Sequence, residues 1–231
     1  MAALDILMIT HDRLDYLKKS LPSVLNQSFK QWHLTIWDND SRQTTKEYLK
    51  NINDPRIRVY YNWDNESLAS ITTRFIRRSG AEFIGKVDSD MIIPEDWASR
   101  LIAKHKEGHY GFLGGFHFRP EDLMSREPII TRGVWYKKHI GGQFIIRRID
   151  FKGYDGEGVM GLSEYQEQTG PNGYLWNPVL FIDHMEDARS EHYIDNSEYN
   201  DYKFKTRGIS LAKYQTGISN KAYLDENCIL R

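Results

Sequence analysis

The sequence of 231 residues is short of cysteine and of net charge, and each shortage excludes a class of protein. The single cysteine, Cys228, excludes an internal disulfide framework and a metal site built from several cysteines. The 31 basic and 32 acidic side chains leave a formal charge of −1, whereas general nucleic-acid binders normally have a clear basic excess. We therefore expect no nucleic-acid partner.

Long apolar runs are also missing. The longest, such as residues 4–9 and 179–182, fall far short of the roughly 20 residues that cross a bilayer. The first ten residues lack the basic start and the cleavage site of a signal peptide, so we expect a cytoplasmic protein. The segment after Asp187 mixes basic and acidic residues, which leaves peripheral membrane association and the oligomeric state open.

The chain does have many apolar residues, and they follow a regular order. Hydrophobic residues make up 40% of it and aromatic residues 13%, enough for the core of one domain over residues 1–231. Apolar strand-like segments alternate with amphipathic ones in the first half, which predicts an α/β fold with a doubly wound, mostly parallel sheet and flanking helices. The expected strands are 4–9, 32–37, 56–62 and 82–87, and the expected helices are 14–29, 42–52, 67–80 and 94–108.

Three details of the elements are also predicted. Pro22 lies within the first helix and predicts a kink or a restart. Gly80 is expected to cap the third helix, and Pro94 to open the fourth. In the less regular second half, strands are expected at 110–118 and 174–184.

Polar side chains follow three of the predicted strands. In open parallel sheets, ligands bind beyond the carboxyl ends of the strands, so these side chains are the candidate binding residues. They are Thr10, His11, Asp12 and Arg13 after the first strand, Asp38, Asn39 and Asp40 after the second, and Asp88, Ser89 and Asp90 after the fourth. Acidic side chains at neighbouring strand ends repel one another unless a cation lies among them.

The most specific of these groups is Asp88-Ser89-Asp90. Its carboxylates suit Mg²⁺ or Mn²⁺, which can in turn bridge a diphosphate. A simple turn before a helix is the alternative interpretation, because Asp and Ser favour turns and caps. The segment after the first strand has neither a G-x-x-x-x-G-K-[ST] nor a G-x-G-x-x-G motif, so no glycine cradle is expected to hold phosphates there.

Residues 6–41 and 67–97 resemble the nucleotide-binding half of family 2 glycosyltransferases, which have the GT-A fold and a D-x-D motif. The resemblance implies that 1–97 bind a nucleotide-sugar, most simply a UDP-sugar, and that 98–231 bind the acceptor and hold the catalytic base. It implies nucleotide contacts from Thr10, His11, Arg13, Asp38, Arg74 and Asp88. It also implies a divalent ion, Mn²⁺ or Mg²⁺, on Asp90 with His184 as a further ligand.

The same resemblance implies an inverting transfer to a hydroxyl of a glycan, lipid-linked or protein acceptor. Glu164 is the expected catalytic base, with Glu157 and Asp155 as rivals. Side chains expected to line the sugar are Trp135, Tyr136 and Trp176, with His139 and the pair Gly141-Gly142 as further candidates on the acceptor side.

Two other functions stay open at this point. A sugar nucleotidyltransferase would use a similar sheet, metal and carboxylates, but usually has a glycine-rich loop after the first strand. A non-catalytic module would bind a nucleotide or a glycan without turnover. Release of pyrophosphate, or binding without transfer, would distinguish these functions from a glycosyltransferase.

Overall fold

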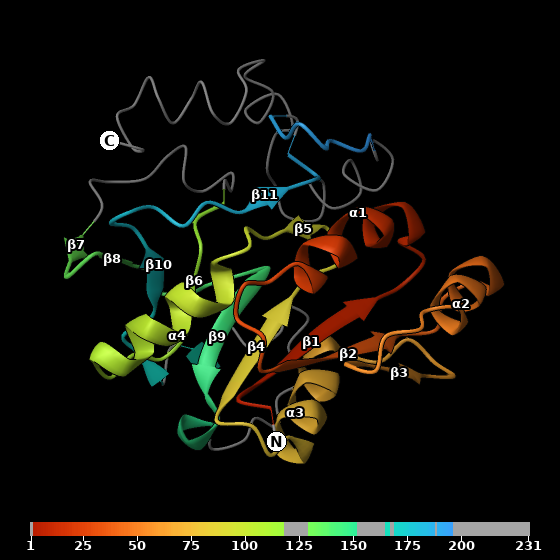
Figure 1. The fold of residues 1–231 in the computed structure, drawn as a ribbon, viewed down its shortest axis with the longest axis horizontal. Coiled ribbons are helices and arrows are strands. Elements are labelled where there is room, and N and C mark those ends of the chain that lie inside the picture. Colours follow the sequence, from red (N-terminus) through yellow and green to blue (C-terminus); the bar gives the residue numbers. More distant parts are fainter. Residues whose placement is uncertain (1, 118–128, 152–164, 167–168, 188, 196–231) are drawn as a thin grey trace.

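The computed structural model describes residues 2–117, 129–151, 165–166, 169–187 and 189–195 (Figure 1). The helices are α1 (Leu14–Leu25), α2 (Gln43–Lys50), α3 (Leu68–Arg78), α4 (Trp97–Glu107) and the short 3-10 helix η2 (Arg148–Asp150). The strands are β1 (Leu4–Thr10), β2 (Trp32–Asp38), β3 (Ile57–Tyr61), β4 (Phe83–Val87), β5 (Met91–Ile92), β6 (Leu113–Gly114), β7 (Ile130–Thr131), β8 (Val134–Tyr136), β9 (Gln143–Arg147), β10 (Gly173–Leu175) and β11 (Asp183–His184).

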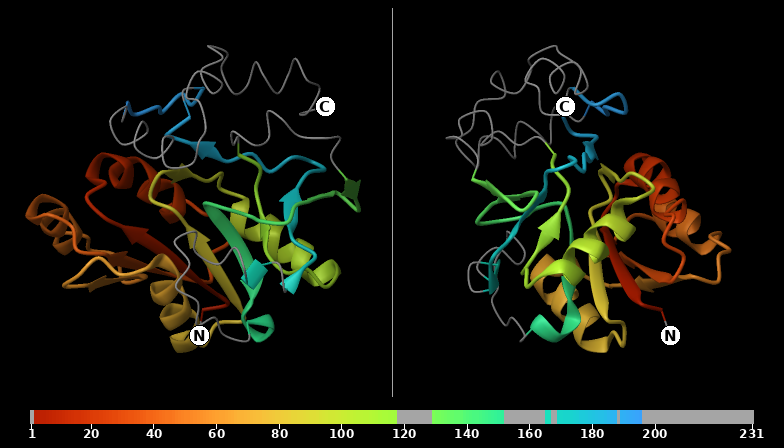
Figure 2. Two further views of the ribbon diagram at one scale, coloured as in Figure 1. Left: turned by 180° about the vertical axis from the view of Figure 1, so that it is seen from behind. Right: turned by 60° about the vertical axis from the view of Figure 1, so that its left-hand side comes forward.

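The main sheet has the strand order β3-β2-β1-β4-β9-β6-β10-β8-β7. Strands β3, β2, β1 and β4 are parallel, with helical crossovers between them, which confirms the doubly wound arrangement expected for the first half. The second half extends the same sheet through β9, which pairs antiparallel with β4. Strands β5 and β11 form a separate antiparallel pair, and Figure 2 shows it crossing the edge where the parallel strands end.

The two faces of the sheet have separate cores, because successive side chains of a strand point to opposite faces. Leu4, Ile6 and Met8 of β1 pack with buried residues of α1, α2 and α4. Leu7 and Ile9 pack with buried residues of α3. Strand β1 is thus covered on both faces, which explains its nearly continuous apolar sequence. Among the described residues, no helix combines the length and the hydropathy needed to cross a membrane.

Several predicted boundaries differ from the structure. Helix α1 continues through Pro22 without a restart. Gly80 does not cap α3, which ends at Arg78 with Ser79 in an extended conformation. Helix α4 begins at Trp97 rather than at Pro94, because the chain first forms the unpredicted strand β5 and a turn closed by Trp97 N–H to the Pro94 carbonyl at 3.1 Å. The strand expected at 174–184 is broken into β10, two isolated bridges (Trp176 with Val179, and Phe181 with Phe116) and β11.

Gln143 is fully buried on β9 and links this strand to α4 and to the residue that follows β6. Its Oε1 accepts hydrogen bonds from Trp97 Nε1 at 2.7 Å and from Gly115 N at 2.9 Å, while its Nε2 donates to the Gly115 carbonyl at 2.7 Å. Gly142, just before it, has φ +74°, and a Cβ there would lie 2.2 Å from Met91 Cε. The positive φ therefore explains why a glycine stands at 142, and Met91 would have to move aside for any larger residue.

His105 links α4 to β9 from a fully buried position. Because its Nε2 lies 2.8 Å from the Ile145 carbonyl, the neutral ring must donate this hydrogen bond through Nε2–H. Burial lowers the pKa of His105 from its usual 6.5 to about 4. The histidine is therefore neutral in the folded protein throughout the neutral range.

The low pKa of His105 predicts a loss of stability in mild acid. The unfolded chain binds a proton at this histidine below pH 6.5, so its contribution to stability is lost as the pH falls from 6.5 towards 4. We expect this group to lower the free energy of unfolding by about 2 kcal/mol between pH 7 and pH 5, measured by urea unfolding. His105→Gln should reduce that fall, whereas His33→Gln, at a half-exposed histidine, should not; an unchanged fall in His105→Gln would contradict the assignment.

Candidate active site

The carboxyl ends of β1 and β2 lie side by side, with Thr10 opposite Asp38 in the parallel register. Both side chains are buried, at 1% and 0% exposure. The Ser41 amide donates to Asp38 Oδ1 at 3.2 Å. Among the described residues, Thr10 Oγ1 and Asp38 Oδ2 find no hydrogen-bond partner. Buried oxygens without partners are costly, so this pair suits a ligand that donates hydrogen bonds at the strand ends.

Asn39 ties the end of β2 to the loop after β3. Its Nδ2 donates to Asn65 Oδ1 at 2.6 Å and to the Glu66 carbonyl at 2.9 Å. Its Oδ1 accepts from Asn62 Nδ2 and from the Glu66 amide, each at 2.9 Å. The Asn39 carbonyl also lies 2.8 Å from Nδ1 of the exposed His11. Asn39 thus positions two loops that flank Thr10 and Asp38, a role that the sequence prediction missed.

Arg74 lies on α3, where it is held by protein groups. It pairs with Glu66 at 2.7 Å, and its guanidinium lies over the Trp37 ring at 5.1 Å from the centroid. These contacts keep Arg74 beside the loop that Asn39 anchors. The structure therefore brings Arg74 near the strand ends, with Glu66 as its partner.

The two carboxylates of the D-x-D motif have different surroundings. Asp88, with about a third of its side chain exposed, forms an ion pair with Lys86 of β4, and its amide donates to the Gly142 carbonyl at 2.7 Å. Asp90 is buried, and its Oδ2 lies 2.5 Å from a guanidinium nitrogen of Arg13. The motif therefore directs one carboxylate towards β4 and the other towards α1.

Asp90 belongs to a cluster that the β5–β11 pair assembles. His184 stands opposite Met91 in this pair, and the Met185 amide donates to the Asp90 carbonyl at 3.0 Å. His184 Nε2 consequently lies 3.7 Å from Asp90 Oδ2 and 3.8 Å from Glu186 Oε2. One ligand atom from each of Asp90, His184 and Glu186 lies within 4.8 Å of the others, so the three side chains could hold a metal ion.

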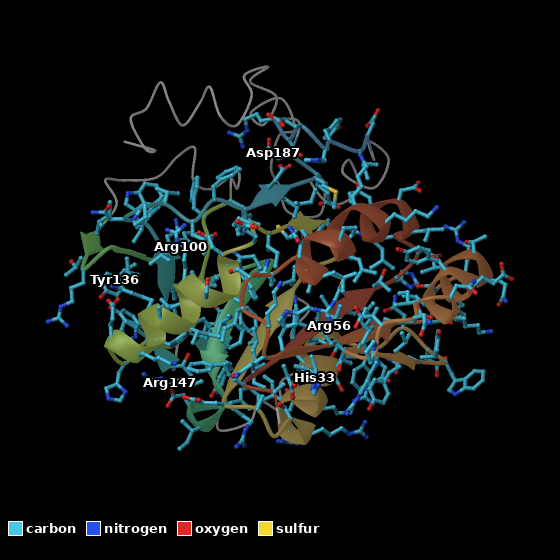
Figure 3. The ribbon with its side chains drawn as sticks, in the orientation of Figure 1. His33, Arg56, Arg100, Tyr136, Arg147 and Asp187 are labelled. Carbon is cyan, nitrogen blue, oxygen red and sulfur yellow. The ribbon has the colours of Figure 1, made fainter. Side chains whose placement is uncertain are left out.

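Glu186 is the member of this cluster that the sequence prediction missed. Its side chain is only 3% exposed, and its Oε1 lies 2.8 Å from the Arg13 guanidinium. The signal that could have found it is a carboxylate only two residues after the predicted metal ligand His184, in the turn that follows β11. The turn that follows is held by a buried ion pair, with Arg189 Nε donating to Asp187 Oδ1 at 2.7 Å; Figure 3 shows Asp187 beside β11.

The sequence matches the model of Glycosyl transferase family 2 over residues 5–161, more than half of the chain. The chain belongs to glycosyltransferase family 2. The predicted family and the predicted GT-A fold are thereby confirmed.

Two curated relatives align with part of this family 2 glycosyltransferase. It is 25% identical over 130 residues to the GalNAc(5)-diNAcBac-PP-undecaprenol β-1,3-glucosyltransferase of Campylobacter jejuni, and 27% identical over 129 residues to the UDP-Glc:α-D-GlcNAc-diphosphoundecaprenol β-1,3-glucosyltransferase WfgD of Escherichia coli. These matches cover 55% and 56% of this chain but only 42% and 49% of those relatives.

Two solved structures show the same fold. The mannosyltransferase PcManGT of Pyrobaculum calidifontis, in complex with GDP-Man and Mn²⁺, superposes with a TM-score of 0.65 at 12% identity, over 88% of this chain and 60% of that one. Residues 1–349 of TarS from S. aureus superpose with a TM-score of 0.58 at 16% identity, over 76% of this chain and 58% of that one.

The predicted catalytic base of this glycosyltransferase, Glu164, lies outside the described residues, as do its rivals Asp155 and Glu157. The described residue Gln166, two positions after Glu164, is buried and pairs in both directions with the backbone of Ile140. Its Oε1 accepts from the Ile140 amide at 2.6 Å, and its Nε2 donates to the Ile140 carbonyl at 2.8 Å.

The aromatic residues that were candidates for stacking on a sugar differ in burial. Trp135 is buried, and its ring lies 5.6 Å from that of Phe116 and 4.6 Å from that of Trp176. Trp135 therefore belongs to an aromatic core, which is the commoner place for such a ring, and not to the sugar site for which it was a candidate. Trp176 and Tyr136 are partly exposed, and so is His139.

The hydrogen bonds of Asn39 predict a large effect from a small substitution. Asn39→Asp keeps the shape but replaces the two donated bonds, to Asn65 and Glu66, with contacts between acceptors. We expect it to lower the free energy of unfolding by roughly 2–4 kcal/mol, measured by urea unfolding. Asn51→Asp, which loses one exposed bond to the Glu47 carbonyl, should cost less than about 1 kcal/mol. Equal losses in the two variants would show that Asn39 has no special role.

Proposed function

We propose that this glycosyltransferase moves a sugar from a UDP-sugar to an acceptor hydroxyl, with inversion at the anomeric carbon and with help from a divalent ion. The observation that carries the proposal is the cluster of Asp90, His184 and Glu186 at the strand-end edge that also holds Thr10 and Asp38. Acidic residues at this edge need a cation before an anionic donor can approach.

The donor set fits Mn²⁺ or Mg²⁺. Two carboxylates and one imidazole are ligands that Mn²⁺ accepts, and the short distances from His184 Nε2 to both carboxylates bring the ligand atoms near one centre. A bound divalent ion would offset the charge that develops on the leaving diphosphate. Support from relatives is indirect, since PcManGT was solved with Mn²⁺ and shares only the fold.

The chain's own residues would bind the nucleotide. The buried oxygens Thr10 Oγ1 and Asp38 Oδ2 suit the N–H donors of a base. Asp88, the more exposed carboxylate of the motif, is proposed to accept from a ribose hydroxyl. His11, Arg13 and Arg74 lie at or near this edge and remain our candidates for further nucleotide contacts.

Glu164 is proposed as the base that takes the proton of the acceptor hydroxyl as its oxygen attacks the anomeric carbon. The names of the Campylobacter jejuni and Escherichia coli relatives refer to glycans linked to undecaprenyl diphosphate. We therefore propose a lipid-linked glycan as the acceptor class. Because the chain spans less than half the length of these two relatives, their full activities are not assumed for it.

A donor panel tests this function. We expect one nucleotide class among UDP-, GDP-, dTDP- and CMP-sugars, with UDP expected, to raise the melting temperature only when Mn²⁺ is present, because the ion lets the anionic donor approach Asp90. Transfer of labelled sugar to a lipid-linked acceptor should require the same ion. Asp90→Ala should abolish both effects, whereas Asp96→Ala, at a half-exposed carboxylate paired with Arg100, should keep them.

The alternatives have distinct outcomes in the same assays. Glu164→Gln should keep the thermal shift and lose transfer, since only the base is removed; unchanged transfer would place the base elsewhere. Pyrophosphate release from a sugar phosphate and UTP would indicate a nucleotidyltransferase. A shift without transfer to any acceptor would favour a binding module, and no shift with any donor would contradict the proposal.

A further inference from the structure

Arg13 occupies the centre of the cluster proposed above as a metal site. One guanidinium nitrogen lies 2.5 Å from Asp90 Oδ2 and the other 2.8 Å from Glu186 Oε1. The guanidinium also lies over the Tyr16 ring, 5.2 Å from its centroid. With about a fifth of its side chain exposed, Arg13 is held by both carboxylates at once.

The oxygen that Arg13 contacts on Asp90 is the one that faces His184. His184 Nε2 lies 3.7 Å from this same Asp90 Oδ2. A divalent ion bound by these atoms would lie next to the guanidinium nitrogen that now contacts that oxygen. Two cations so close repel strongly where solvent is largely excluded, and Glu186 is 3% exposed.

The charges of the cluster also disfavour the presence of Arg13 and a divalent ion in it at the same time. Within the part of the chain that the structure describes, Lys86 pairs with Asp88, and Arg13 pairs with Asp90 and Glu186. One guanidinium offsets half of the charge of these two carboxylates, whereas a divalent ion would offset all of it. Arg13 and a divalent ion together would exceed the charge of these two carboxylates.

We propose that Arg13 is the resident cation of this site, which stabilises the acidic cluster until a divalent ion displaces it. The inference rests on the metal site of the proposed function. It assigns to Arg13 a role in setting metal affinity, because binding of the ion must break both of its ion pairs. Removing the charge of Arg13 should therefore strengthen metal binding and weaken the metal-free protein.

Calorimetric titration with Mn²⁺ alone tests this role on the full chain. Arg13→Met should bind Mn²⁺ at least about tenfold more tightly than the wild type, because no cation has to leave. Arg13→Gln, which also lacks the charge but keeps a polar side chain, serves as a second neutral variant with the same expected direction. Arg13→Lys keeps the charge and should stay within about threefold of the wild type. Arg56→Met removes an arginine paired with Asp54, well away from Asp187 in Figure 3, and should leave Mn²⁺ affinity unchanged.

A second readout is thermal stability with EDTA and with saturating Mn²⁺. In EDTA, the neutral Arg13 variants should have a lower melting temperature than the wild type. Saturating Mn²⁺ should raise their melting temperature by more than it raises that of the wild type. Equal or weaker Mn²⁺ binding by both neutral variants, with transfer still metal-dependent, would overturn the inference and leave the proposed function standing. Absence of Mn²⁺ binding in the wild type, with metal-independent transfer, would overturn the metal site and the inference together.

Discussion

The candidate active site depends on the pairing of two very short strands, β5 and β11. This pairing places His184 opposite Met91, and the hydrogen bond from the Met185 amide to the Asp90 carbonyl extends it by one residue. The D-x-D segment and His184 are more than ninety residues apart in the sequence, and this pairing brings them together. Because so few backbone hydrogen bonds hold β11, the turn after it needs its own support, which the buried Asp187–Arg189 ion pair supplies.

Charge balance is the second constraint on this edge of the sheet. Buried carboxylates are costly unless cations or hydrogen-bond donors accompany them. Three acids at the edge have a cation beside them, since Lys86 accompanies Asp88 and Arg13 accompanies Asp90 and Glu186. The buried Asp38 instead accepts from the Ser41 amide. The near-zero net charge of the chain therefore conceals a local concentration of acidic residues. Lys86 and Arg13, which pair with these acids, are part of the site.

Much of the first half could be predicted from the sequence, for physical reasons. Strands β1, β2 and β4 are buried on both faces, so their apolar runs are long and their polar ends stand out. The parallel order then places Thr10 beside Asp38, as the register shows. Asp90 and His184 were also predicted to meet, from the resemblance to the family.

The second half could not be predicted to the same degree. Strands β5, β6, β7 and β11 have two residues each, too short for any periodicity in the sequence, and their pairing comes from contacts distant along the chain. Glu186 was missed because it lies in the turn after β11, where no periodicity in the sequence shows which way a side chain points. The positioning role of Asn39 was missed because the four groups that bond its side chain, on Asn62, Asn65 and Glu66, lie in the loop after β3. The sequence does not show where that loop lies. Trp135 was a candidate for the sugar site and fills the core instead, because the sequence alone does not distinguish a stacking ring from a core ring.

We propose that a divalent ion binds between Asp90, His184 and Glu186 in place of Arg13. Crystals grown with Mn²⁺ and UDP, measured at the manganese absorption edge, test it most directly. We expect one anomalous peak within coordination distance of Asp90, His184 and Glu186, about 2.0–2.3 Å from each ligand atom, with the Arg13 guanidinium moved away from Asp90. A peak elsewhere, or a peak at the cluster with both Arg13 ion pairs still in place, would contradict it.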